Sequence, residues 1–76
     1  MKNNTKVNAA ILIIGNEILS GRTQDTNTST LAKWLNTMGV KVREVRVIPD
    51  IEKTIVDTLN FLRASNNYVF TTGGIG

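Results

Sequence analysis

Three strongly apolar segments alternate with two segments whose apolar residues recur at helical spacing. Residues 9–14 form an unbroken apolar run, which is typical of a strand covered on both faces in a parallel sheet. Residues 40–48 are rich in β-branched types but change phase at Glu44 and Val45, which favours a strand nearer the sheet edge that contains a β-bulge. Residues 68–72 form a third, aromatic and β-branched strand.

The two intervening segments each predict one amphipathic helix. Cap-type residues at 25–28 precede the first apolar stripe and Gly39 follows it as a C-cap. A polar turn at 64–67 follows the second stripe. The stripes are Leu31, Trp34, Leu35 and Met38, and Ile51, Ile55, Leu59 and Leu62.

The resulting order, βαβαβ, predicts an α/β fold with a parallel sheet and right-handed crossovers. If the first strand lies between the other two, the helices cover opposite faces of the sheet. We expect residues 1–8 to be a disordered or extended N-terminus and residues 9–76 to form the N-terminal part of a domain. The third strand runs into glycines with no helix after it, so a longer chain or partner chains would have to cover it.

The amino-acid composition excludes several kinds of catalytic and metal-binding side chain. The 76 residues include no cysteine and no histidine, so acids, bases and metal ligands must be carboxylates, hydroxyls or backbone groups. The net charge of +3 mildly favours anionic partners. Scattered basic residues and few aromatics predict no nucleic-acid binding, and the short apolar run at 9–14 predicts no signal peptide and no membrane span. We therefore expect a cytoplasmic protein.

The segment at 13–23, Ile-Ile-Gly-Asn-Glu-Ile-Leu-Ser-Gly-Arg-Thr, resembles a phosphate-binding loop at first sight. A Walker A loop requires four residues between its glycines and then Lys-Ser or Lys-Thr. Here five residues separate Gly15 from Gly21, an arginine follows, and Glu17 would repel phosphate unless a metal ion lay between them. A structural interpretation makes the glycines two bends and Glu17 a solvated or capping carboxylate.

A functional interpretation comes from the strand ends, because open parallel sheets bind ligands beyond the carboxyl ends of their strands. The loops expected there begin at Gly15, at Asp50 and at Thr72. Glycine backbone amides can approach an anion closely, and the carboxylates of Glu17 and Asp50 are the best candidates for holding Mg²⁺. The alternative for Asp50 is the N-cap of the helix that starts near Ile51.

These residues together form motifs of a known family. The chain resembles the molybdopterin-binding domain (MoaB/Mog-like) of molybdenum-cofactor biosynthesis proteins and of competence-damage-inducible CinA-type proteins, and it looks closer to the CinA-type branch. The motifs that carry the resemblance are Gly15-x-Glu17-Ile18-Leu19-x-Gly21, Asp25-Thr26-Asn27, Asp50 after the second strand, and Thr71-Thr72-Gly73-Gly74-x-Gly76.

The resemblance implies a three-layer α/β domain, often trimeric when it stands alone, that binds a pterin or nucleotide over the strand ends of its parallel sheet. It implies that Asp50 is the acidic, metal-linked site residue and that Glu17 and Asn27 shape the neighbouring loop. The ligand-binding residues implied are Gly15, Glu17, Asn27, Thr72, Gly73, Gly74 and Gly76.

The activities implied are adenylyl transfer to molybdopterin and cleavage of a nucleotide-sugar pyrophosphate, each with Mg²⁺. The partners implied are a small-molecule pterin or nucleotide and further copies of the chain in a homo-oligomer. The sequence differs from the family pattern at Asn16 and Ile75, where many members carry Asp and Thr, and the family's Pro-Thr-x-Asp-Asp segment is absent. We therefore expect little activity from this chain alone, and a noncatalytic ligand-sensing or assembly module is the alternative.

Overall fold

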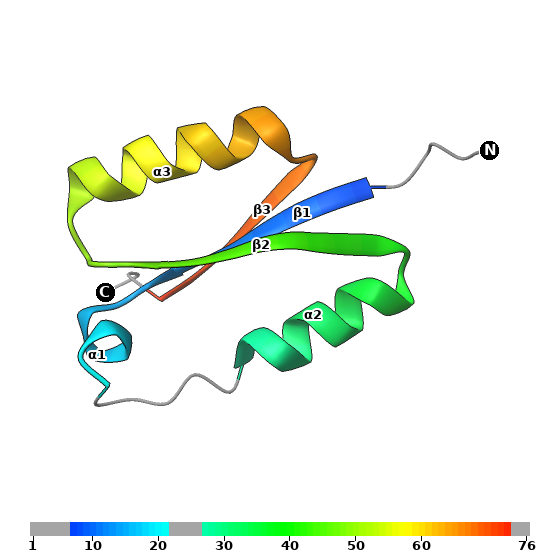
Figure 1. Ribbon diagram of the computed structural model, residues 1–76, viewed down its shortest axis with the longest axis horizontal. Helices are drawn as coiled ribbons and strands as arrows, with labels where there is room; N and C mark the ends of the chain where they lie inside the picture. Colours follow the sequence, from blue (N-terminus) through cyan, green and yellow to red (C-terminus); the bar gives the residue numbers. More distant parts are fainter. Residues whose placement is uncertain (1–6, 22–26, 74–76) are drawn as a thin grey trace.

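The protein forms a three-stranded parallel sheet with one long helix on each face (Figure 1). The computed structural model describes residues 7–21 and 27–73. Its strands follow the order β2-β1-β3, which confirms the three-layer βαβαβ fold. The elements in chain order are β1 (Val7–Ile14), α1 (Asn16–Leu19), α2 (Asn27–Thr37), β2 (Val40–Ile48), α3 (Glu52–Ser65) and β3 (Tyr68–Gly73).

Strand β1 is the centre of the core, as its unbroken apolar run predicts. It begins at Val7, two residues before the predicted start. Alternate residues of a strand point to opposite faces, and one set of β1 side chains packs with Ile48 and with Leu62 of α3. The other set faces the layer of α2, where Leu35 is buried. The β1 members of the first set are Ala10, Leu12 and Ile14.

Strand β2 contains the β-bulge that its change of phase predicts. Val42 pairs with Ala9 but Glu44 pairs with Ala10, so Arg43 is the extra residue. The bulge places Val42 and Val45 on one face of the sheet, because they pair with Ala9 and Ile11 of β1, although they are three positions apart in sequence. The Arg43 side chain also donates a hydrogen bond to the carbonyl of Ser65, the last residue of α3 (3.3 Å).

The apolar stripe predicted for α2 is only partly buried. Leu35 is buried, but Trp34 and Met38 are 57% and 53% exposed. The arc that faces the sheet is centred near Leu35 and includes the half-buried Ala32, so the large side chains of Trp34 and Met38 lie at its border. The apolar residues alone therefore predicted a buried face that is rotated toward Trp34 and Met38 relative to the face that packs on the sheet.

The end of α2 follows from the conformational freedom of a glycine. Gly39 adopts a left-handed conformation (φ +82°) two residues after Thr37, the last residue of the helix, which confirms the predicted glycine cap. None of the helices in residues 7–21 and 27–73 is long and apolar enough to cross a membrane.

Candidate functional site

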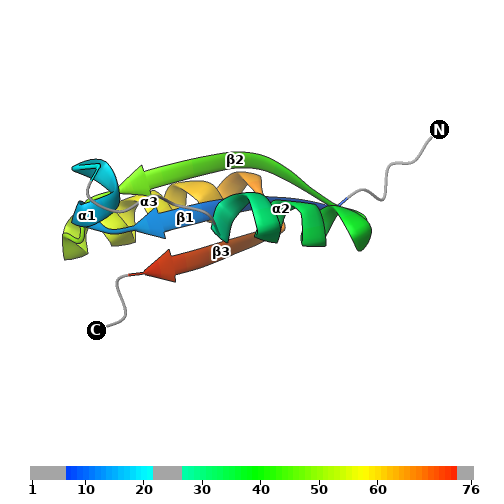
Figure 2. The same ribbon diagram turned by 90° about the horizontal axis from the view of Figure 1, so that it is seen from below.

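The three strands end together at one edge of the sheet. Ile14 of β1 pairs with Ile48 of β2 and with Gly73 of β3, so the segments that follow all leave from the same end. Figure 2 shows the three arrowheads pointing the same way, with α1 beside them. This carboxyl edge is where an open parallel sheet binds ligands.

The segment after β1 is more regular than predicted. We expected a glycine-bearing loop, but residues 16–19 form the short helix α1, because the backbone carbonyls of Gly15 and Asn16 accept the N–H groups of Leu19 and Ser20 (3.4 and 2.9 Å). This single turn is followed by Gly21 in a left-handed conformation (φ +79°). The structure therefore differs here from a P-loop, in agreement with the spacing of its glycines.

Gly15 and Glu17 lie against one another at the end of β1. The N–H of Gly15 donates to the carbonyl of Ile48 (3.0 Å), which ties this segment to β2. A Cβ atom on Gly15 would lie 2.9 Å from Oε2 of Glu17, so the missing side chain leaves the space in which the Glu17 carboxylate lies. Glu17 itself is exposed to solvent.

Asp50 lies in a tight turn at the end of β2. The N–H of Ile51 donates to the carbonyl of Pro49 (2.9 Å), which closes a three-residue turn centred on Asp50. The N-cap of α3 is Ile51, without a side-chain cap bond. The helix-cap interpretation of Asp50 is therefore wrong, because the turn places Asp50 one residue before the cap. Its side chain is exposed.

Asn16 links the segment that carries Glu17 to the turn that carries Asp50. The sequence alone did not predict this contact. The Oδ1 atom of Asn16 accepts the backbone N–H of Asp50 (3.1 Å). The two residues are 34 positions apart, and only the pairing of β1 with β2 brings them together. Sequence reasoning treated Asn16 simply as a departure from the family pattern, and its one signal was its position between Gly15 and Glu17.

Gly73 occupies a position that only glycine fits. Its φ of +77° lies in the left-handed region, and a Cβ atom there would overlap the carbonyl oxygen of Ile14. Strands β1 and β3 can thus approach closely where β3 ends. Thr72, half-buried, directly precedes this position. Gly74 and Gly76 lie outside the described residues, as does the side chain of Asn27, the residue at which α2 begins.

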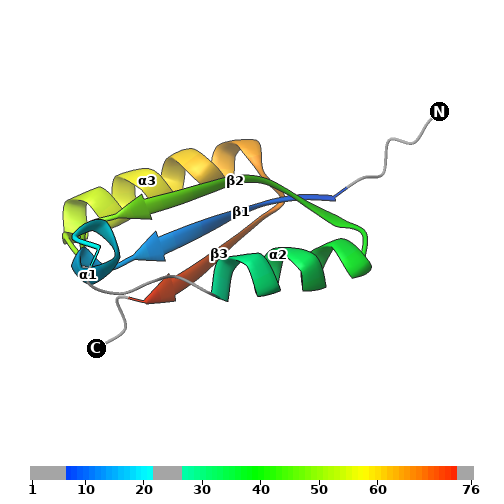
Figure 3. The same cartoon turned by 60° about the horizontal axis from the view of Figure 1, so that its bottom comes forward.

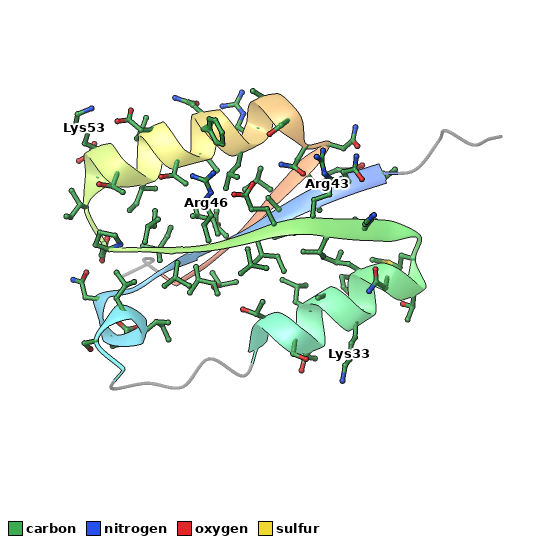
Figure 4. The ribbon with its side chains drawn as sticks, viewed as in Figure 1. Lys33, Arg43, Arg46 and Lys53 are labelled. Atoms are coloured by element: carbon green, nitrogen blue, oxygen red, sulfur yellow. The ribbon has the colours of Figure 1, made fainter. Side chains whose placement is uncertain are left out.

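The basic side chains near the helices are engaged elsewhere or point outward. Asp57 raises the pKa of Lys53 by accepting its hydrogen bond (2.7 Å) and by its negative charge. Arg46 pairs with Glu44 and lies over the ring of Phe61, so it occupies the space between β2 and α3 in Figure 4. Lys33 points away from the sheet (Figure 4). The ion pairs of Arg46 and Lys53 thus involve neither Glu17 nor Asp50.

The carboxyl edge carries two carboxylates of the kind that can serve as Mg²⁺ ligands. Proteins usually hold Mg²⁺ with one or two carboxylates, and phosphate oxygens of the substrate supply further ligands. The described residues contain no cluster of three or more His, Cys, Asp or Glu side chains. Glu17 and Asp50, however, leave from adjacent strands that Asn16 links. Two carboxylates fit a cation that is shared with a phosphate-bearing ligand.

These features define a parallel α/β domain with glycine and carboxylate residues at the carboxyl edge of its sheet. Residues 10–76 match the family model described as "Probable molybdopterin binding domain". The chain belongs to this family, and the resemblance predicted from its motifs is confirmed.

Two relatives with different names have sequences similar to this chain. The chain is 44% identical over 68 residues to the "Probable FAD synthase" of Caenorhabditis elegans, covering 90% of this chain and 13% of that protein. It is 41% identical over 68 residues to a "CinA-like protein" of Flavobacterium psychrophilum, covering 90% of this chain and 16% of that protein. The chain thus spans less than one fifth of the length of either protein.

A solved structure has the same fold. The crystal structure of the protein CinA, of unknown function, from Thermoplasma acidophilum matches with a TM-score of 0.87 and 32% sequence identity. The match covers 96% of this chain and 43% of that chain. The CinA-like character predicted from the glycine segment is therefore supported by sequence and by structure.

Proposed function

We propose that this domain binds a pterin or nucleotide that carries a pyrophosphate, together with Mg²⁺, at the carboxyl edge of its sheet. The observation that carries the proposal is the joining of Glu17 and Asp50 through Asn16 at the end where β1, β2 and β3 meet. Membership of the molybdopterin-binding family supports a ligand of this class. The name of the Caenorhabditis elegans relative, "Probable FAD synthase", supports a nucleotide as the ligand.

Each residue has a separate part in this proposal. Glu17 and Asp50 would hold the cation through their carboxylates. Thr72 and Gly73 would bring backbone and hydroxyl groups close to the phosphates, because Gly73 has no side chain to keep a ligand away. Bound Mg²⁺ would neutralise the charge of the phosphate oxygens.

The proposed reactions are adenylyl transfer to molybdopterin and cleavage of a nucleotide-sugar pyrophosphate. Both are displacements at phosphorus, in which preorganised positive groups stabilise charge on phosphate oxygens. The second candidate is a noncatalytic ligand-sensing module. It is favoured by the observation that the described residues contain no third carboxylate grouped with Glu17 and Asp50.

Titration calorimetry with ADP, in the presence and absence of Mg²⁺, tests the binding proposal. We expect Mg²⁺ to strengthen ADP binding to the unmodified protein. Asp50→Asn should weaken Mg²⁺-dependent binding about tenfold or more, because the neutral amide loses the charge that a hard cation prefers. The melting temperature should barely change, since Asp50 is exposed and caps no helix.

Glu52→Gln is the matched control, because it removes an exposed carboxylate from the first turn of α3. This variant should bind ADP and Mg²⁺ like the unmodified protein. Equal Mg²⁺ dependence in Asp50→Asn and in the unmodified protein would remove Asp50 from the site.

A further inference from the structure

The segments that leave β1 and β2 are joined by two hydrogen bonds of different kinds. The N–H of Gly15 donates to the carbonyl of Ile48, which continues the backbone ladder one step past Ile14. Pro49 has no N–H to donate. The next donor along β2 is the N–H of Asp50, and it is taken by the Asn16 side chain rather than by backbone.

This side-chain contact fixes the turn that carries Asp50. The turn itself contains one backbone bond, from Ile51 to Pro49, and the Asp50 side chain is exposed. Among the described residues, its carboxylate has no hydrogen-bond partner. The direction of this carboxylate therefore depends on the backbone at Asp50, which is hydrogen-bonded to Asn16, the first residue of α1. Figure 3 shows α1 beside the end of β2.

We propose that Asn16 is a positioning residue, which holds Asp50 in the orientation that binds Mg²⁺; this inference rests on the proposed function. Asn16 acts through its Oδ1 atom, and an aspartate carboxylate would offer the same acceptor. The amide differs in that it adds no third negative charge between Glu17 and Asp50. Asn16 thus links the two acidic segments without making the edge more repulsive to a phosphate-bearing ligand.

The opposite end of the sheet supplies a matched control. There the Oδ1 atom of Asn67 accepts the backbone N–H of Asn8 (2.9 Å). This contact has the same chemistry and also joins segments distant in sequence, but it lies at the amino ends of the strands. Removing it tests the loss of one asparagine–backbone bond without disturbing Asp50.

The first measurement is the exchange rate of the Asp50 amide proton with water, followed by NMR. Asn16→Ala should increase this rate about fivefold, the effect of losing one hydrogen bond of ordinary strength. Asn16→Asp should keep the rate near that of the unmodified protein, because the acceptor remains. Asn67→Ala should increase the rate at Asn8 and leave the rate at Asp50 unchanged.

The second measurement is Mg²⁺ affinity, obtained from the same spectra by titration with the metal alone. Asn16→Ala should weaken binding about tenfold, as is typical when a partner of a metal ligand is removed. Asn16→Asp should bind Mg²⁺ at least as tightly as the unmodified protein, and Asn67→Ala should bind it equally.

The outcomes separate this inference from the proposed function. If the unmodified protein binds Mg²⁺ and Asn16→Ala leaves that affinity or the Asp50 exchange rate unchanged, the positioning role is overturned. If the unmodified protein shows no Mg²⁺ binding, the proposed function itself fails. Faster exchange and weaker binding in Asn16→Ala, both restored by Asn16→Asp, would support both.

Discussion

Gly73 combines a left-handed backbone with close contact between two strands. Replacing it with alanine should lower the free energy of unfolding by about 3 kcal/mol, because the strain of a left-handed alanine adds to the overlap with the Ile14 carbonyl. Gly39→Ala is the control, since Gly39 has nearly the same φ but a Cβ atom there would meet nothing within 4 Å. It should cost only about 1 kcal/mol. Equal losses for the two variants in denaturant unfolding would refute the steric argument.

Residue types and strand ends were enough to place Gly15, Glu17 and Asp50 at one edge of the sheet. They were not enough to assign their contacts. Whether Asp50 caps α3 depends on a single residue of register at the helix start, and sequence patterns do not resolve that. The contact of Asn16 with Asp50 arises from strand pairing across 34 residues, so no local pattern contains it.

At the scale of elements, α3 packs on the sheet through its buried residue Leu62, with Ile55 and Leu59 partly buried against the same cluster. Leu62 is fully buried in the cluster formed with β1 and Ile48, whereas its neighbour Phe61 is 58% exposed. Leu62→Ala should cost about 3 kcal/mol of stability, because it removes a buried side chain and leaves a cavity. Phe61→Ala should cost about 1 kcal/mol, mainly through its contact with Arg46. Similar losses for both variants in thermal unfolding would contradict this packing.

The sequence patterns predicted some features of the helices and strands and missed others. The bulge in β2 was predictable because the β-branched residues on either side of Arg43 are out of phase. The buried arc of α2 was not, because the small residue Ala32 contributes to packing without adding to a hydrophobic stripe. The helix α1 was missed because four residues are too few to show a period.

At the scale of the whole molecule, the order of layers followed from one property, the unbroken apolar run of β1. A strand buried on both faces must lie inside the sheet, which fixes β2 and β3 as its neighbours and places the two long helices on opposite faces. The homo-oligomer stays a prediction. Its support is the exposure of Trp34 on α2, of Met38 directly after α2 and of Tyr68 on β3.

The central claim is that the carboxyl edge of the sheet binds a divalent cation together with a phosphate-bearing ligand. The most direct measurement is anomalous diffraction from crystals of the protein grown with Mn²⁺, as a substitute for Mg²⁺, and ADP. We predict an anomalous peak between the carboxylates of Glu17 and Asp50, with the ADP phosphates beside the end of β3. A bound ADP with no peak at this edge, or a peak at other carboxylates only, would contradict the claim.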